Sequence, residues 1–434
     1  MKKKYITFSI VTLVLLVALI TSFNYFKTTN TYVENNSNNQ TKITKGISMN
    51  LEQTAGAGDY KTVTQSGWPT EGYKFNTELS RCENGSTLSW DDTKKAVIVS
   101  GNLSDKCYVY FDIYVPPRFD ETCDTSTLAC YIAKQYTGTQ GDNSLYYHDS
   151  NLTNGAGDNS YRYAGANPNN FVCFGSDASP CPTDNLYRII GVFGEGYHGV
   201  SEKQLVKLIK YDYANSNLLG TDGDYMTTSI PDALYYKGSL RTIYRYYWNN
   251  DTGTNTWSTS LLNKTNLNTN FINNIGMTWA NKIATVTWKV GGNTYANISQ
   301  SVPATTYQNE IVNPVTTNTT DNATTYSAKI GLMYVSEYGF ATEPSAWTTK
   351  LYIYDGSVNG STIRSQNWMH MGYYDWTISR NSDHYYIAFI VNSTGDVHHN
   401  NVSNYIGVRP SFNLESSVSY VSGLGSMSDP IVIN

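Results

Sequence analysis

The hydrophobic and polar positions first single out the N-terminal end of the chain. Residues 1–27 start with MKKK and continue as a nearly unbroken apolar run, YITFSIVTLVLLVALITSFNYF. About twenty apolar residues behind a basic start are typical of a secretory signal or of a retained signal-anchor that spans the membrane. We expect a retained anchor with the lysines on the cytoplasmic side, which places the remaining chain outside the cell. A cleaved signal peptide is the alternative.

The polarity changes abruptly after this segment. Residues 28–46, TTNTYVENNSNNQTKITKG, contain almost no apolar side chains. Such a stretch buries too little surface to fold, so we expect a flexible spacer. An anchor, a spacer and a globular remainder describe a protein tethered at the cell surface.

Residues 47–117 show the two-residue alternation of β-strands. In CYVYFDI, residues 107–113, polar and aromatic side chains alternate with Val109, Phe111 and Ile113. Asn84-Gly85 is the strongest short signal for a β-hairpin, because both residues tolerate positive φ. Pro116-Pro117 cannot donate to a ladder and should end the region. The pattern predicts a small β-sandwich-like domain.

The pattern of residues 121–434 is less regular. Residues 121–136 have helical spacing, whereas LYRIIGVF and QLVKLIKYDYA read as two strands that pair with each other. Further strand-like runs alternate with long polar loops, and the terminal PIVIN should pair back onto the sheet. We expect one irregular, β-rich α+β domain over 121–434, with its core in 161–434.

Composition supports strands and restricts the partners. The chain has 37 tyrosines and only 15% charged residues, which suits half-buried pleated surfaces better than helices. The net charge is −5, and the first thirty residues carry four lysines and no acid, so the remainder carries −5 − 4 = −9. An acidic exterior disfavours nucleic acid and gives no basic patch for anionic lipid.

The six cysteines indicate the redox compartment. They fall in three close pairs: Cys82 with Cys107, Cys123 with Cys130, and Cys173 with Cys181. An even number outside the membrane predicts disulfides, although fifteen connectivities are possible and this pairing rests on proximity alone. The competing metal site would need CxxC spacing and histidine partners. Neither is present, so no metal and no cofactor are expected.

Several segments together resemble a known group of proteins. They are NPNNFVCFG, LYRIIGVFG, QLVKLIK, KIGLMYVSEYGFA, YIGVRPSFNL and GSMSDPIVIN. As a set, covering roughly 160–434, they resemble a family of uncharacterised surface proteins of gut Firmicutes. The C-terminal domain of that family is similar, more remotely, to the formylglycine-generating-enzyme and C-type-lectin-like folds. The resemblance implies a lectin-like head with an extracellular binding or cell-envelope role.

The chemistry of those remote folds is not expected here. Formylglycine-generating enzymes bind copper through two late cysteines, and this chain has no cysteine after Cys181. Sugar-binding C-type lectins hold calcium with oxygen ligands from a Glu-Pro-Asn loop and a later Trp-Asn-Asp. Here the loop is Glu343-Pro344-Ser345 and no Trp-Asn-Asp follows.

The candidate ligand contacts are aromatic residues in loop-like sequence near the C-terminal end. Tyrosine and tryptophan combine a large rigid area with a polar group, which suits recognition surfaces and sugar stacking. The candidates are Trp347, Trp368, Tyr373, Tyr374 and Trp376. The alternative is that Trp368 and Trp376 belong to the core. Arg409, in GVRP, is interpreted chiefly as a buried guanidinium in a structural ion pair, with a contact to a ligand carboxylate as the alternative.

The hypothesis that follows is a non-catalytic binding module at the extracellular face of the bacterial membrane, or secreted if the signal is cleaved. Its ligand would be a glycan or a protein on host or neighbouring cells. No pattern for catalysis is present, and no catalytic residue is assigned. A secreted enzyme on the same broad fold and a purely structural envelope protein are the alternatives.

Overall fold

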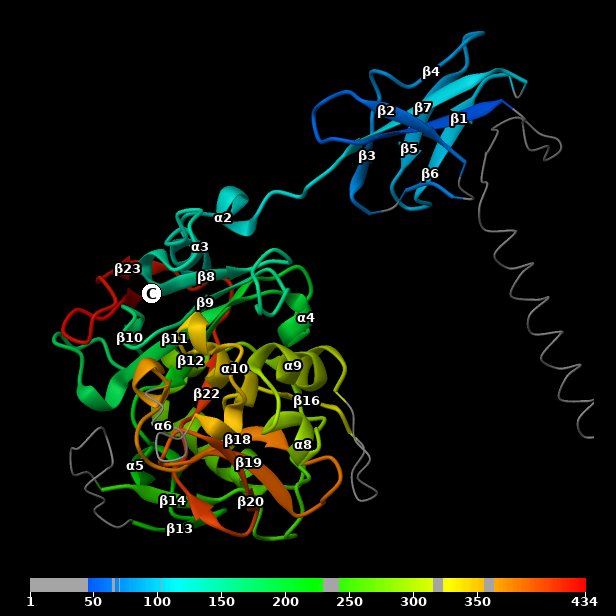
Figure 1. The fold of residues 1–434 in the computed structure, drawn as a ribbon. Coiled ribbons are helices and arrows are strands. Elements are labelled where there is room, and N and C mark those ends of the chain that lie inside the picture. Colours follow the sequence, from blue (N-terminus) through cyan, green and yellow to red (C-terminus); the bar gives the residue numbers. More distant parts are fainter. Residues whose placement is uncertain are drawn as a thin grey trace, which may run out of the picture. The chain divides into compact units, whose positions relative to one another are not determined.

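The computed structural model describes residues 46–64, 67–69, 71–102, 104–228, 242–314, 323–354 and 363–434. The chain forms two compact units, Met1–Pro117 and Arg118–Asn434 (Figure 1). The expected membrane segment at 1–27 lies outside the described residues, as does the expected spacer at 28–46 except for Gly46. Within the described ranges, no helix is both long and apolar enough to cross a membrane.

The first unit consists of two small layers of strands around one core. A five-stranded sheet contains β1 (Ile47–Glu52), β2 (Tyr60–Val63), β3 (Tyr73–Phe75), β4 (Arg81–Cys82) and β7 (Cys107–Ile113). The second layer is the hairpin of β5 (Thr87–Asp91) and β6 (Ala96–Ser100). Alternate side chains fill the core, as the pattern predicts: Met49, Leu51, Phe75, Val97, Val109 and Phe111.

The predicted hairpin at Asn84-Gly85 is wrong. Strand β4 pairs with β7 and β5 pairs with β6, so this turn connects the two layers. The physical reason is Asp105, whose carboxylate accepts hydrogen bonds from the backbone N–H groups of Asn84 and Ser86 at 2.8 and 3.1 Å. A tertiary contact therefore fixes the turn, and the local propensity does not decide which strands it joins.

The second unit is built on an antiparallel seven-stranded sheet. Its order is β17-β22-β12-β11-β9-β8, and β10 also pairs with β11. The strands are β8 (Leu145–His148), β9 (Ser160–Tyr163), β10 (Phe171–Cys173), β11 (Leu186–Phe193), β12 (Leu205–Lys210), β17 (Ile330–Gly331) and β22 (Ser411–Asn413). Every residue of β11 and β12 is buried, so both faces of the sheet are covered at its centre. The predicted pairing of β11 with β12 is confirmed.

Smaller sheets and short helices surround this sheet. The strands are β13 (Tyr225–Thr228), β14 (Tyr244–Tyr247), β15 (Val286–Lys289), β16 (Thr325–Ala328), β18 (Asp375–Arg380), β19 (Ile387–Val391), β20 (Val397–Asn401), β21 (Tyr405–Ile406), β23 (Tyr420–Ser422) and β24 (Val432–Ile433). The helices are α2 (Phe119–Thr122), α3 (Leu128–Ala133), α4 (Glu195–His198), α5 (Ser216–Leu219), α6 (Ile272–Ile275), α7 (Met277–Ala280), α8 (Tyr295–Ile298), α9 (Pro303–Tyr307) and α10 (Val335–Phe340), with π-helical turns at Leu262–Phe271 and Gln308–Val312. The chain is thus β-rich with few and short helices, as predicted.

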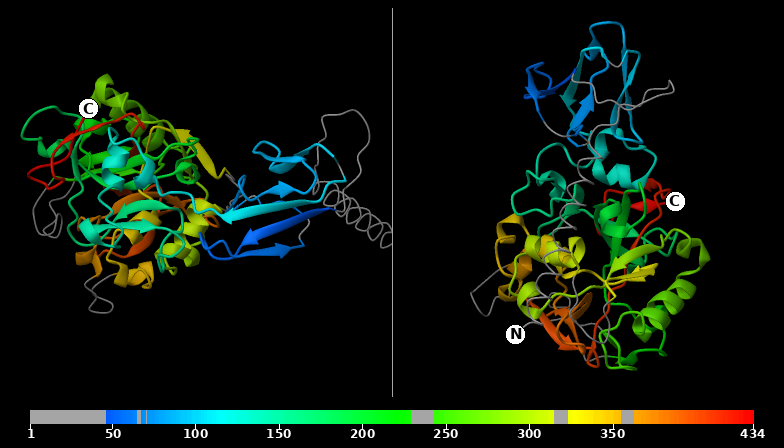
Figure 2. Two further views of the ribbon diagram at one scale, coloured as in Figure 1. Left: turned by 90° about the horizontal axis from the view of Figure 1, so that it is seen from above. Right: turned by 90° about the vertical axis from the view of Figure 1, so that its right-hand side faces the viewer.

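The C-terminal segment returns to the central sheet (Figure 1 and Figure 2). Ile431 lies parallel to Val172, and its N–H donates to the carbonyl of Phe171 at 2.9 Å. The Cys173 N–H donates in turn to the Ile431 carbonyl at 2.9 Å. The expected pairing of PIVIN with the sheet is therefore confirmed.

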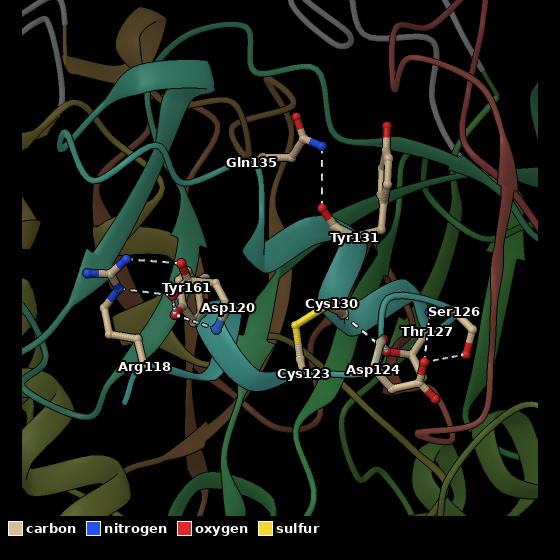
Figure 3. Close-up of a disulfide and its surroundings, with 10 residues drawn as sticks. All are labelled: Arg118, Asp120, Cys123, Asp124, Ser126, Thr127, Cys130, Tyr131, Gln135 and Tyr161. Atoms are coloured by element: carbon tan, nitrogen blue, oxygen red, sulfur yellow. Dashed lines mark hydrogen bonds and ion pairs between the residues drawn. A yellow bond between two sulfur atoms is a disulfide. The ribbon is translucent and has the colours of Figure 1, made fainter. Parts of the chain in front are cut away.

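The three predicted disulfides are all present, and one of them divides the helix expected over 121–136. Figure 3 shows the Cys123–Cys130 bridge between α2 and α3. Between the helices, the Asp124 carboxylate accepts from the Ser126 N–H at 2.9 Å, and Thr127 caps α3 by accepting from the Cys130 N–H at 3.3 Å. Because these side chains satisfy the backbone locally, a new helix starts there and the two do not merge.

Each disulfide closes a loop within one unit, so we expect each to stabilise only that unit. Replacing Cys173 and Cys181 together by serine should destabilise the second unit by about 2–3 kcal/mol, given the short loop that they close. Calorimetry of the full chain should show the melting transition of the first unit unchanged. The matched control replaces Cys82 and Cys107 by serine, which should move only the first unit's transition. A shift of both transitions in either variant would contradict this independence.

Candidate functional site

A cluster of buried charged side chains occupies the centre of the second unit. Lys207 of β12 lies with its Nζ 2.7 Å from Oε1 of Glu337 in α10, and both side chains are fully buried. Aromatic rings surround the ammonium, with ring centroids 4.3–5.1 Å from Nζ: Tyr334, Trp288 and Tyr197. Burial lowers the pKa of Lys207, an effect that the Glu337 carboxylate opposes. The pair thereby ties the central sheet to α10.

A second carboxylate supports the start of the same helix. Glu310 accepts from the backbone N–H groups of Val335 and Ser336 at 3.1 and 3.0 Å, and from the hydroxyl of Ser379. Burial raises the pKa of Glu310 to about 7. These contacts satisfy the first N–H groups of α10, which lack partners within the helix.

Further buried polar side chains near this cluster join neighbouring strands and helices. Arg162 donates from Nη2 to Asp158 at 2.6 Å, and Tyr307 donates to the same carboxylate at 2.8 Å. His148 is fully buried, and burial lowers its pKa well below the usual value, so the imidazole is neutral. None of these residues lines the three cavities described below. The cluster therefore has a structural role and offers no surface to a substrate.

The surface feature suited to a ligand is a groove around the loop of residues 164–170, between β9 and β10. Three cavities of about 160, 420 and 450 Å³ meet there. Asn167 lines all three, Asn169 lines the first and second, and Ser144 lines the first and third. The three cavities adjoin at these shared residues and are together called the loop groove below.

The second cavity forms the aromatic end of the loop groove. Its walls include Phe171, Tyr211, Trp368, Met371 and Met427. At its floor, the guanidinium of Arg188 lies between two rings, 4.3 Å from the Phe171 centroid and 4.6 Å from that of Trp368. Stacking of this kind holds a cation in place while its N–H groups bind elsewhere.

Arg188 uses those N–H groups to hold the loop. Its Nε donates to Oδ1 of Asn170 at 2.6 Å, and its Nη2 donates to the carbonyl of Pro168 at 2.9 Å. At the other end of the loop, the Gly165 N–H donates to the carbonyl of Ala341 at 3.1 Å, and the Trp368 N–H donates to the carbonyl of Gly165 at 3.0 Å. The loop is thus fixed at both ends before any ligand arrives.

Between these fixed ends, Asn167 and Asn169 are exposed. Among the described residues, neither side-chain amide has a hydrogen-bond partner. Each amide offers two donors and one acceptor. The rigid loop therefore presents two polar groups to whatever occupies the groove.

The first cavity forms the polar middle of the groove, with Tyr131 and Gln135 from α3 and its C-terminal extension. Figure 3 shows these two side chains, with Gln135 donating to the Tyr131 carbonyl at 3.3 Å. The facing wall contains Asn143 and Ser144, which adopt left-handed φ values of 56° and 59°. Two consecutive non-glycine residues in this region are strained, and such strain tends to gather at functional sites.

The third cavity contains the only acidic residue of the groove lining. It is walled by Tyr146, Gly165 and the turn Glu343–Ser345. Burial and the nearby Glu343 carboxylate raise the pKa of Tyr146, so its hydroxyl stays protonated. Across the lining residues of all three cavities, the charged side chains are Arg188 and Glu343. The groove is therefore close to neutral.

The predicted ligand contacts do not lie together in the structure. Trp368 lines the groove, although it is only 1% exposed. Trp347 is buried behind Tyr146, with ring centroids 5.5 Å apart, and Trp376 is buried with its indole N–H donating to the Tyr246 carbonyl at 3.0 Å. Their indole faces pack in the core, so they offer no stacking surface to solvent. For Trp376 this placement corresponds to the core interpretation, whereas the prediction of Trp347 as a ligand contact is wrong, because its indole finds ring neighbours and a backbone acceptor inside.

The other predicted contacts lie outside the groove lining. Tyr373 and Tyr374 are half-buried and pack against each other with centroids 5.5 Å apart. Arg409 is buried and forms an ion pair in which its Nε donates to Asp375 at 2.5 Å, and its Nη2 donates to the Met369 carbonyl at 2.7 Å. The structural ion pair is thus present, and the guanidinium lines none of the three cavities.

The groove residues that sequence reasoning missed come mainly from one turn-like segment. AGANPNN, residues 164–170, carries glycine, proline and three asparagines and is a recognisable turn sequence. That signal marks a loop and does not reveal a site. The convergence of this loop with Arg188, Met371 and Met427 depends on the tertiary fold.

The comparisons with known proteins add no relative: no family model, no curated protein and no solved structure matches the chain. Within the described residues, no group of three or more His, Cys, Asp and Glu side chains could hold a metal ion.

The buried pair of Lys207 and Glu337 should matter strongly for stability. Lys207→Met removes the cation and leaves a carboxylate in the interior, which should cost about 3–5 kcal/mol of unfolding free energy. Adding Glu337→Gln should recover part of that loss, because the amide needs no counter-charge and still accepts from the backbone. Urea denaturation followed by circular dichroism measures both. A double variant less stable than Lys207→Met alone would contradict the argument.

Glu310 should make the stability of the second unit depend on pH. Its folded-state pKa of about 7 lies above the ordinary 4.5, so the folded chain holds the proton more tightly than the unfolded chain. The resulting stabilisation is complete below pH 4.5 and is lost as the pH rises through about 7, by on the order of 2–3 kcal/mol. Urea midpoints between pH 4 and 8 should show this fall in the native chain. Glu310→Gln should flatten it, and Glu343→Gln, at an exposed position, should leave it unchanged.

Proposed function

We propose that the second unit is a non-catalytic binding module whose loop groove takes a glycan chain. The main observation in support is the loop of residues 164–170, which is held at both ends. It presents the side-chain amides of Asn167 and Asn169, which have no partner among the described residues, between the aromatic end and the polar middle of the groove. Sugar rings offer apolar C–H faces to aromatic side chains and hydroxyl groups to amides. A surface fixed in advance loses little entropy on binding.

The near-neutral lining supports a neutral ligand. A nucleic acid or an acidic polymer would require several cations, and the groove contains one, Arg188, which is engaged with the loop. One common mode of peptide recognition adds an extended segment to an open strand edge through its backbone. The groove instead presents side-chain amides, hydroxyls and rings, which favours a glycan over a peptide.

The number of carboxylates in the groove lining also favours ligand binding over glycoside hydrolysis. Glycosidases use two carboxylates that flank the scissile bond. The groove lining contains one, Glu343, while Glu310 and Glu337 lie in the interior with protein partners. A secreted enzyme is therefore less well supported than a binding module.

The disulfides give part of the evidence for the cellular location of the chain. Disulfides form and persist in oxidising compartments, so three of them indicate an extracellular or secreted chain. We further propose that residues 1–27 hold the chain at the outer face of a bacterial membrane, and that residues 121–434 belong to the C-type-lectin-like class. The basic start with its apolar run supports the anchor, and the resemblance of several segments supports the class.

The test is a glycan array probed with the full-length chain and with an Asn167→Ala, Asn169→Ala double variant. Both amides are exposed and without partners in the described structure, so folding should be unaffected. Loss of two ligand hydrogen bonds should weaken binding about tenfold or more. The matched control is Asn273→Ala, an exposed asparagine of α6 outside the groove, which should bind as the native chain does.

Two results would contradict the proposal. The first is saturable glycan binding that the double variant retains in full, since the ligand would then lie elsewhere. The second is the absence of binding to any glycan, and self-association of the chain would then favour a structural envelope role.

A further inference from the structure

We infer that the aromatic end of the loop groove is a subsite for the acetamido group of an N-acetylated sugar. The inference rests on the proposed function and narrows it to one class of sugar substituent. It starts from the lining of the second cavity, which includes three aromatic rings and two thioethers, whereas the linings of the other two cavities contain no phenylalanine, tryptophan or methionine.

The walls of the second cavity would penalise an ordinary hydroxyl-bearing sugar. Phe171 and Met371 are 8% and 4% exposed, so a group that enters this end leaves water for an apolar environment. A sugar hydroxyl placed there without a partner loses its hydrogen bonds to water. A methyl group instead gains free energy from the same burial, by roughly 0.8 kcal/mol.

The rim of this cavity supplies the complementary polar groups. Asn167 and Asn169 both line it, and each side-chain amide can donate and accept at once. An acetamido group carries one N–H donor and one carbonyl acceptor directly next to its methyl. It therefore matches an apolar pocket with amides at the rim better than a hydroxyl or a bare amine does.

The charge at the floor is consistent with a neutral occupant. Arg188 donates from Nε and Nη2 to Asn170 and Pro168 and lies close to the rings of Phe171 and Trp368, so these two N–H groups hold the loop while the guanidinium keeps its positive charge. A carboxylated sugar is the competing occupant, because its anion would be drawn to the guanidinium. The experiment must separate the two.

Because the three cavities adjoin at Asn167, the inference extends to ligands of more than one sugar unit. Asn167 lines all three cavities, and the polar walls beyond it contain Asn143, Ser144 and Glu343. With the acetamido group at the aromatic end, the neighbouring units of the chain lie along the amides and hydroxyls. Affinity should therefore rise with chain length.

The test compares two neutral trisaccharides that differ only at the 2-position. Isothermal titration of the full-length chain should show a β-1,4-linked N-acetylglucosamine trimer binding about tenfold or more tightly than the β-1,4-linked glucose trimer. The N-acetylglucosamine monomer should bind more weakly than its trimer.

Met427→Ala shortens a side chain in the wall of the second cavity. Because this side chain is 46% exposed, the fold should tolerate the change. This variant should weaken binding of the acetylated trimer several-fold more than binding of the glucose trimer. Met277→Ala, at an exposed methionine outside the groove, is the matched control.

The outcomes distinguish this inference from the proposed function. Equal affinity for the two trimers, or tighter binding of a carboxylated trisaccharide, overturns the acetamido subsite and leaves glycan binding standing. Binding of neither trimer while other glycans on the array bind has the same meaning. Binding of no glycan at all overturns both.

Discussion

The ion pair between Lys207 and Glu337 is the interaction on which the second unit depends most. It joins the middle of the central sheet to α10, and neither side chain has solvent-accessible surface. Removing two charges from water is costly, and the cost is offset only when geometry and further hydrogen bonds are good. Here the carboxylate also accepts from the Tyr334 N–H at 2.8 Å, and the ammonium is enclosed by aromatic rings. The ion pair therefore favours one position of α10 on the sheet, because any other position would leave the two buried charges unpaired.

The loop groove inherits its rigidity from this helix. Ala341, which ends α10, accepts the hydrogen bond that fixes Gly165 at the start of the groove loop. Arg188 fixes the other end of the loop from β11, the neighbour of β12 in the sheet. The exposed amides of Asn167 and Asn169 are therefore placed by two elements that the buried pair holds together. Neither Lys207 nor Glu337 lines the groove, so the ion pair bears on its shape only through the elements that it positions.

Much of the fold could be read from local patterns, and the groove could not. The continuous apolar runs of β11 and β12 predict buried, paired strands, and cysteines seven and eight residues apart leave few distant partners. The turn at Asn84-Gly85 shows the limit, because Asp105 from another part of the chain decides which strands it connects. The tryptophans show the same limit in a second way. Loop-like sequence around Trp347 and Trp376 does not reveal that folding places both indoles in the core.

The pairing of Ile431 with β10 has a consequence for the order in which the groove can form. Residues 424–431 form one wall of the groove, and every other lining residue precedes position 372. A chain is synthesised from its N-terminal side, so the groove loop and Arg188 are available before this wall, whereas the central sheet still awaits β22. A chain made only as far as position 423 therefore lacks one wall of the groove.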